Sequence, residues 1–281
     1  MFKVIRMVER VTITIKKDML RRVDSMVDGR EVRNRSHAIE NLLARSLSKT
    51  GLDTALIMAG GEGVHLRPIT YEIPKPLIPI HGKPVLEHQI NLLKKHGINN
   101  ILLSVNYMSE KIQQHFGDGK KFGVDITYII EDKPMGTAGP ISLAREYISK
   151  SFLLLNVDTL MDPNIYEMYE FHKRQRKMAT VLLTTVDDPT RFGVVKMLGN
   201  QVLKFVEKPK AGDAPSRLIN AGLCIFDASV ANMVPKRKMM IEELFKKLSK
   251  DEQLVGFLHD GITFDVGTTK GYEKAIKEWK N

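Results

Sequence analysis

The stretch AGGEGVHLRP at residues 59–68 follows an apolar run, DTALIM, that has the character of a buried strand. Three glycines allow close backbone approach to a ligand, and a loop of this kind can direct backbone amides at an anion. The stretch lacks the G-x-G-x-x-G pattern, because Leu66 replaces the last glycine, and it also lacks G-x-x-x-x-G-K-[ST]. On its glycines alone, it is equally compatible with a tight turn and a phosphate site.

Charged residues further along the chain favour the phosphate site. Lys75 stands between two prolines in PKPLIPIHGKP, and carboxylates follow other predicted strands. Ligands of an open α/β sheet lie beyond the carboxyl ends of its strands, where such groups would meet. The chemistry indicated is phosphoryl transfer, which needs positioning, positive charge and a hard metal ion rather than covalent catalysis.

The elements that must position these groups alternate along residues 51–281. We expect apolar strands at 55–59, 99–107, 125–130 and 152–160, each followed by an amphipathic helix. Such alternation predicts an α/β domain with a mostly parallel sheet covered on both faces. Strands expected at 179–186, 192–197, 201–209 and 218–227 predict a mixed extension of that sheet, and a helix over 269–279 follows.

Ordered blocks over nearly all of residues 53–281 resemble the sugar-1-phosphate nucleotidylyltransferases. The blocks are MAGGEGVHLRPIT, PKPLIPIHGKP, MGTAGP, LNVDTL, FVEKP, NAGLCIF and FDVGTTKGYEKA. The resemblance implies a Rossmann-like nucleotidyltransferase domain in which a sugar-1-phosphate oxygen attacks the α-phosphorus of a nucleoside triphosphate (NTP). An NDP-sugar and pyrophosphate would be the products.

The same resemblance assigns roles to individual residues. It implies that Asp158 and Asp265 hold Mg²⁺, with Lys75 and His65 at the phosphates, so that these four form the catalytic set. It places Glu207 at the sugar and Lys208 at the sugar phosphate. The residues implied in nucleotide binding are Ala59, Gly60, Gly61 and Gly63 at the triphosphate and Gly136 at the base.

The loop departs from the family pattern at the position of the usual arginine. The usual G-x-G-T-R-L has Val64-His65 in place of the Thr-Arg pair, and Val157 replaces the glycine usual before the magnesium aspartate. Arginine is permanently charged, whereas a histidine with the ordinary pKa of about 6.5 is only partly charged at neutral pH. We therefore expect a triphosphate site with a weaker, pH-sensitive cation, and a non-catalytic nucleotide sensor is the alternative.

The first fifty residues form a different pattern. ERVTITIKK alternates strictly between apolar and polar residues and predicts a strand. Two helical patterns follow, the first with Asp18 at its start and the second capped by Ser36. Of the net charge of +10, residues 1–50 carry +6, with 12 Lys and Arg against 6 Asp and Glu.

This unit, over roughly residues 8–48, resembles the ribbon-helix-helix repressors. The resemblance implies that the strand pairs with the same strand of a second copy and enters the major groove of double-stranded DNA. Arg10, Thr12 and Thr14 would face the bases, and backbone amides near Arg35 and Ser36 would grip a phosphate. A dimerisation module that binds no nucleic acid is the alternative.

These observations predict a small DNA-binding and dimerisation domain at 1–50 and a nucleotidylyltransferase domain at 51–281. The fusion indicates a homodimer or higher homo-oligomer that links nucleotide-sugar supply to transcription. Two alternatives stay open: a regulator whose large domain only senses ligand, and an enzyme whose small domain only dimerises. No apolar run reaches the roughly 20 residues of a membrane helix, so we expect a cytoplasmic protein. We expect no chemical role for Cys224, the single cysteine.

Overall fold

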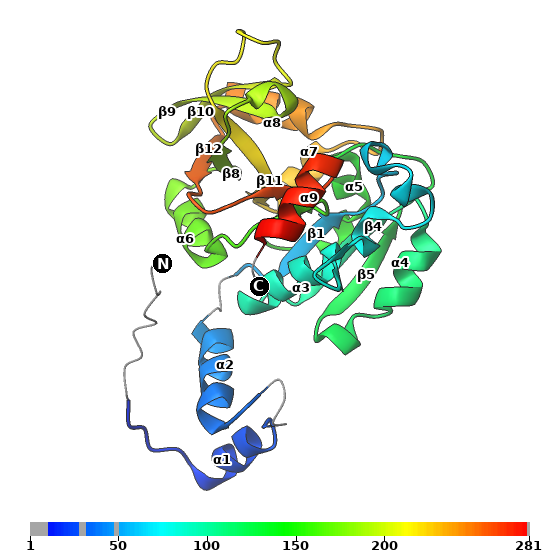
Figure 1. The fold of residues 1–281 in the computed structure, drawn as a ribbon. Helices are drawn as coiled ribbons and strands as arrows, with labels where there is room; N and C mark the ends of the chain where they lie inside the picture. The colour runs from blue at the N-terminus through cyan, green and yellow to red at the C-terminus, as the bar shows by residue number, and fades with distance from the viewer. Residues whose placement is uncertain (1–10, 28–31, 48–50, 280–281) are drawn as a thin grey trace. The chain divides into compact units, whose positions relative to one another are not determined.

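The computed structural model describes residues 11–27, 32–47 and 51–279 (Figure 1). The chain divides into two compact units, Met1–Ser48 and Lys49–Asn281, a division close to that expected from the sequence. Each unit has its own fold, and each is described here by itself.

The first unit contains helices α1 (Lys17–Asp24) and α2 (Arg35–Leu47). Each helix buries a small apolar residue, Val23 in α1 and Ala38 in α2. Asp24 accepts two hydrogen bonds from Arg35 at 2.7 and 2.9 Å, which joins the two helices. The cap of α2 differs from the prediction, because Asn34 rather than Ser36 accepts a hydrogen bond from the backbone of His37, at 2.9 Å.

The strand predicted before α1 is absent from the single chain. Residues 11–16 have no regular secondary structure, and Val11 and Ile13 are 73% and 53% exposed. A lone strand leaves its backbone groups and its apolar face without a partner, so it gains little by forming within one copy. Thr12 and Thr14 are exposed, and Arg10 lies outside the described residues. Pairing with a second copy therefore stays a prediction.

In the second unit, nine strands of the described chain form one sheet in the order β5-β4-β1-β6-β11-β8-β12-β10-β9. Its first half is parallel, as predicted for a Rossmann-like domain. This half consists of β5 (Asp125–Ile130), β4 (Asn100–Val105), β1 (Thr54–Met58) and β6 (Phe152–Asn156). The carboxyl ends of β1 and β6 therefore meet at one edge of the sheet.

The second half of the sheet is mixed, as predicted for the extension formed by the strands after residue 179. β11 (Leu218–Phe226) runs antiparallel to β6 and to β8 (Ala179–Thr185), and β12 (Leu254–Leu258) is parallel to β8. β10 (Gln201–Glu207) pairs antiparallel with β12 and with β9 (Gly193–Leu198). The short turn between β9 and β10 requires antiparallel neighbours, since a parallel pair needs a long crossover.

Helices cover both faces of the sheet, so alternate residues of β1 enter different cores (Figure 1). Ala55 and Ile57 pack in one buried cluster and Leu56 in the other. The first cluster includes residues of α3 (Val85–Lys95), α4 (Ser109–Phe116) and α6 (Ile165–Gln175). The second includes residues of α5 (Gly139–Leu143), α7 (Val230–Met233) and α8 (Ile241–Lys250). Burial on both faces explains why the central strands are apolar throughout.

Two small ribbons lie in a third buried cluster, together with the last helix, α9 (Thr269–Glu278). One ribbon pairs β2 (Pro79–Ile80) with β3 (Lys83–Pro84), and the other pairs β7 (Thr159–Leu160) with β13 (Phe264–Asp265). In the second ribbon Asp265 lies opposite Thr159. β13, which comes late in the sequence, therefore lies beside the turn that follows β6.

Cys224 is buried within β11, and burial raises the pKa of its thiol, as suits a core residue without a chemical role. Within the described residues, the helices are all too short or too polar to cross a bilayer.

Candidate active site

The loop after β1 is shaped around Lys75. Gly63 has a left-handed backbone, with φ of 67°, and a Cβ there would lie 2.8 Å from Cγ of Lys75. The same Cβ would lie 2.7 Å from Cγ2 of Thr70, whose hydroxyl donates a hydrogen bond to the Gly63 carbonyl at 2.8 Å. Glycine is therefore required at position 63 both for its conformation and for the passage of the lysine side chain.

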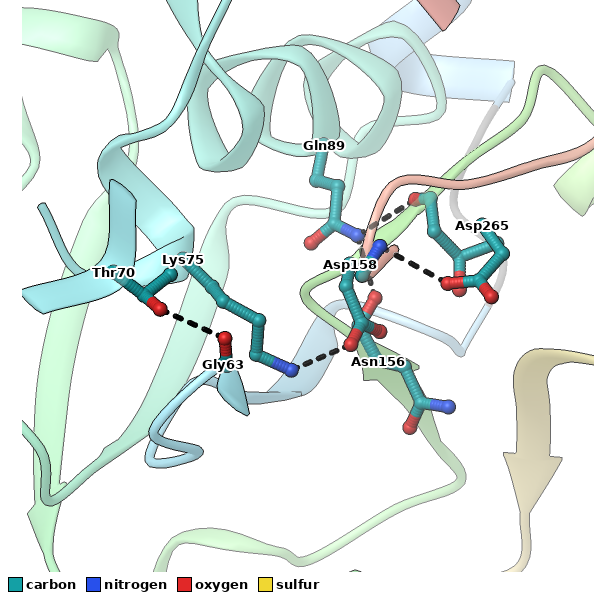
Figure 2. A network of polar contacts seen from close by, with 9 residues as sticks. Gly63, Thr70, Lys75, Gln89, Asn156, Asp158 and Asp265 are labelled. Atoms are coloured by element: carbon teal, nitrogen blue, oxygen red, sulfur yellow. Dashed lines mark hydrogen bonds and ion pairs between the residues drawn. The ribbon is translucent and has the colours of Figure 1, made fainter. Parts of the chain in front are cut away.

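Lys75 meets Asp158 across this edge of the sheet. Lys75 begins a short 3₁₀ turn after Pro74, and Asp158 lies in the turn between β6 and β7. The Lys75 ammonium donates to the Asp158 carboxylate at 2.5 Å, with the side chains only 17% and 25% exposed (Figure 2). The pair brings together a predicted phosphate ligand and a predicted metal ligand.

Asp265 converges on the same point from β13. A Cβ placed on Gly267 would lie 2.9 Å from an Asp158 oxygen and 3.0 Å from an Asp265 oxygen. The backbone amide of Gly267 donates to Asp265 at 3.0 Å (Figure 2). Burial raises the pKa of Asp265, and the charge of Asp158 raises it further, whereas the Gly267 hydrogen bond, Arg191 and Lys75 lower it. Two carboxylates that repel one another around a space kept open by a glycine could hold a cation.

Gln89 holds the turn that carries Asp158. Its side-chain amide, buried in α3, donates to the carbonyls of Asn156 at 2.7 Å and Thr159 at 2.9 Å (Figure 2). These two carbonyls flank Asp158, so the helix fixes the turn on both sides of the aspartate. The remaining oxygen of Gln89 is buried without a hydrogen-bond partner.

Two cavities adjoin at the aspartates. The first, of about 530 Å³, is lined by the loop after β1, with Gly63, Val64 and His65, and by Lys75 and Lys208. The second, of about 640 Å³, extends over Asn220 and Gly222 toward Arg217. Asp158, Arg191 and Asp265 line both cavities, so a reaction between two bound molecules could take place where the cavities join.

The other predicted nucleotide ligands have different surroundings. A Cβ on Gly61 would lie 3.4 Å from the Lys75 ammonium, whereas one on Gly60 would lie 2.9 Å from a Glu131 oxygen. Ala59 is buried, and its amide already donates to Ser104, which leaves no amide free for a phosphate. Gly136, with φ of 77°, packs against Met239 and does not belong to the described lining of either cavity.

Glu207 ends β10, and its carboxylate lies 3.6 Å from the ammonium of the next residue, Lys208. Lys208 lines the first cavity, but Glu207 does not belong to the described lining of either cavity. Burial raises the pKa of Glu207, and the charge of Glu242 in α8 raises it further, while Lys208 and Lys246 lower it. The structure thus brings Lys208, but not Glu207, together with the aspartates.

Sequence reasoning missed three residues near these cavities. Gln89 gave no signal, and Arg191 resembled any surface arginine. Glu131 follows β5 directly, as a carboxylate at a strand end, and that position could have revealed it. It is buried, accepts from the Ser104 hydroxyl at 2.6 Å and from the Met135 amide at 2.9 Å, and so links β4 to the segment before α5.

Comparison with known proteins identifies the fold and the family of this chain. Residues 54–281 match the nucleotidyl transferase family. The chain belongs to the nucleotidyl transferase family. It is 38% identical over 225 residues to the mannose-1-phosphate guanylyltransferase catalytic subunit beta of Xenopus tropicalis, covering 78% of this chain and 62% of the relative. It is also 38% identical over 227 residues to the mannose-1-phosphate guanyltransferase of Yarrowia lipolytica, covering 77% and 61%.

This nucleotidyl transferase thus spans about three fifths of the length of those curated relatives. Among solved structures, it is similar to a putative glucose-1-phosphate thymidylyltransferase from Bacillus anthracis, with a TM-score of 0.74 and 27% identity. That match covers 80% of this chain and 94% of the solved one. The comparisons therefore confirm the predicted α/β nucleotidyltransferase domain, while the family match begins at residue 54, after the first unit.

The two aspartates of this nucleotidyl transferase fit a magnesium ion. Magnesium takes oxygen ligands and commonly combines one or two carboxylates with substrate phosphates. Asp158 and Asp265 supply two converging carboxylates, and Gly267 leaves room between them. Among the described residues no larger cluster of metal-binding side chains exists, which agrees with a site completed by substrate.

Proposed function

We propose that residues 51–281 catalyse nucleotidyl transfer to a sugar-1-phosphate. A phosphate oxygen of the sugar-1-phosphate attacks the α-phosphorus of an NTP, a new O–P bond forms, and the bond to the β-phosphate oxygen breaks. Pyrophosphate leaves with the electron pair, and the NDP-sugar stays. The observation that carries this proposal is the meeting of Lys75, Asp158 and Asp265 at the join of two cavities large enough for two substrates.

The residues act chiefly by position and charge. The cavity at the loop after β1 takes the triphosphate, and the cavity beyond the aspartates takes the sugar. Lys75, held by Asp158 in the free site, is placed to contact phosphate oxygens, and Lys208 contacts the sugar phosphate. A magnesium ion held by Asp158 and Asp265 would supply neutralisation of phosphate charge.

We propose guanosine triphosphate and mannose-1-phosphate as the preferred pair. The support is the 38% identity to proteins named for that activity, higher than the 27% identity to the thymidylyltransferase-like structure. The second cavity has the hydrogen-bonding groups that a sugar needs, including the side chains of Asn220, Thr184 and Arg217.

A pyrophosphate-release screen tests both proposals. The common NTPs are combined with mannose-1-phosphate and glucose-1-phosphate, in the presence of magnesium, and the NDP-sugar is detected by mass spectrometry. We expect turnover to be fastest with guanosine triphosphate and mannose-1-phosphate, and absent in Asp158→Asn. Preference for another pair would overturn the substrate assignment alone, and nucleotide binding without any product would favour the sensor.

We further propose that the first unit pairs with a second copy and binds double-stranded DNA. The exposed apolar face of Val11 and Ile13 lacks a partner within one chain, and the capped α2 presents the amide ends expected to meet a phosphate. The net charge of +6 on residues 1–50 supports the same proposal. The test is fluorescence anisotropy with random double-stranded DNA. Absence of binding at low salt would leave dimerisation as the role of this unit.

A further inference from the structure

Arg191 lies where the two cavities join. It ends the short 3₁₀ turn Pro189–Arg191 before β9, and it lines both cavities together with Asp158 and Asp265. Its side chain is exposed, and within the described part of the chain no carboxylate forms an ion pair with it. The other cations of the first cavity are engaged: Lys75 pairs with Asp158 at 2.5 Å, and the Lys208 ammonium lies 3.6 Å from Glu207.

The backbone beside Arg191 is well held. The Asp188 carboxylate accepts from the amide of Thr190 at 3.0 Å and from its hydroxyl at 2.7 Å. On the other side, the carbonyl of Phe192 accepts from the amide of Lys208 at 2.9 Å. The backbones of Arg191 and Lys208 are therefore held close together beside the first cavity, which both residues line. A cation on a rigid support is placed before substrate arrives, which is the condition for electrostatic stabilisation of a transition state.

We propose that Arg191 is a catalytic residue that contacts the reacting phosphates and supplies a permanent charge at the first cavity, whose described lining includes His65 of the loop but not Arg67. The inference rests on the proposed function. During attack the α-phosphate and the sugar phosphate approach each other, and the join of the cavities is the place where their negative charges meet. A guanidinium there can contact oxygens of both phosphates, because its planar fork presents several donors.

Single substitutions test the assignment. In Arg191→Gln we expect kcat/KM to fall about a hundredfold or more, the usual effect of removing one preorganised stabiliser, with the thermal midpoint unchanged. Arg191→Lys keeps the charge without the fork and should retain intermediate activity. Arg174→Gln, which removes an exposed arginine from α6, is the matched control and should behave as the wild type. Wild-type kcat/KM in Arg191→Gln would overturn the assignment.

A rescue experiment separates catalysis from a structural effect. If Arg191 replaces the missing loop cation, Arg191→Gln combined with His65→Arg should recover at least tenfold of the lost kcat/KM. If kcat/KM of the double variant is equal to or lower than that of Arg191→Gln, the idea that one cation replaces the other is contradicted.

The binding of pyrophosphate keeps the inference separate from the proposed function. If the wild type turns over no substrate pair, the proposed function fails, and calorimetric titration with magnesium pyrophosphate then decides the inference. Affinity at least tenfold weaker in Arg191→Gln than in wild type and Arg174→Gln would support a phosphate-contacting arginine. Equal affinity in all three proteins would overturn it.

Discussion

At the scale of single residues, Asp158 and Asp265 show how charge is organised at the site. Asp158 is neutralised by Lys75, whereas Asp265 has a raised pKa because it is buried beside another carboxylate. The Asp158 carboxylate thus takes part in two interactions: it attracts the Lys75 ammonium and repels the Asp265 carboxylate. This arrangement stores repulsion that a cation would relieve, and it supports the magnesium assignment by the chemistry of the ligands.

Replacing either aspartate should suppress turnover. Asp158→Asn and Asp265→Asn each remove one carboxylate from the proposed magnesium site, so we expect kcat to fall by about two to three orders of magnitude. Ground-state nucleotide binding should weaken less, because other groups also contact the triphosphate. Steady-state kinetics and calorimetry of nucleotide binding measure the two effects, and undiminished turnover in either variant would remove that residue from the site.

Glu242 should make stability depend on pH through Glu207. The pKa of Glu207 is raised by burial and by Glu242, so the ionised form is disfavoured in the folded protein. Wild-type stability should therefore rise as pH falls from neutral through that raised pKa. Glu242→Gln removes the repulsion, and we expect it to stabilise the fold at neutral pH and to lose this advantage at mildly acidic pH.

Urea unfolding at neutral and at mildly acidic pH measures the stability that Glu242→Gln gains over the wild type. Glu167→Gln is the matched control, because Glu167 occupies the first turn of α6 as Glu242 occupies the first turn of α8. If the free energy of unfolding depends on pH equally in Glu242→Gln and Glu167→Gln, the repulsion assigned to Glu207 and Glu242 is refuted.

At the scale of elements, α3 fixes the geometry of the site as well as covering the sheet. Gln89, a polar residue of its buried face, hydrogen bonds to both sides of the Asp158 turn. The strands and helices predicted for the second unit were confirmed, but α7, α8 and β12 were missed. In β12, Gly256 weakens the strand signal, and its place is explained only by packing, since a Cβ there would lie 2.5 Å from Leu183.

Gln89→Met should damage the site more than the fold. The side chains have similar size, but methionine cannot donate to the carbonyls of Asn156 and Thr159. Two lost hydrogen bonds should lower the free energy of unfolding by about 1–3 kcal/mol. Because the turn that carries Asp158 loosens, we expect kcat to fall while KM for the nucleotide changes little. A loss of stability with wild-type kcat in the folded protein would show that Gln89 has no positioning role.

At the scale of the whole molecule, the two units are expected to divide the functions. The residues proposed for catalysis all belong to Lys49–Asn281, and the unpaired apolar face belongs to Met1–Ser48. Residues 1–50 also hold more than half of the net charge. Proteins of this organisation can lose one activity without losing the other.

Removal of residues 1–50 should leave turnover intact and abolish dimerisation and DNA affinity. In the full chain, DNA affinity should fall steeply with salt, with a slope of about 0.9 per phosphate contact on the logarithmic scale. Anisotropy titrations and sedimentation check these outcomes. Full DNA affinity in the truncated chain would exclude the first unit as the binding site. The double variant Thr12→Ala, Thr14→Ala should lose only its preference among DNA sequences.

The sequence by itself determined the α/β class of the second unit, its central parallel strands and the residues Lys75, Asp158 and Asp265. The class and the strands follow from local patterns, because strand burial and turn chemistry are written in neighbouring residues. The three residues follow from the resemblance of the ordered blocks to the sugar-1-phosphate nucleotidylyltransferases. Only the tertiary structure decided that Gly63 makes way for Lys75, that Gln89 holds the Asp158 turn and that Arg191 lies between two cavities. Such contacts join residues far apart in the chain, and no local pattern specifies which distant groups the packing of the sheet and its helices will bring together.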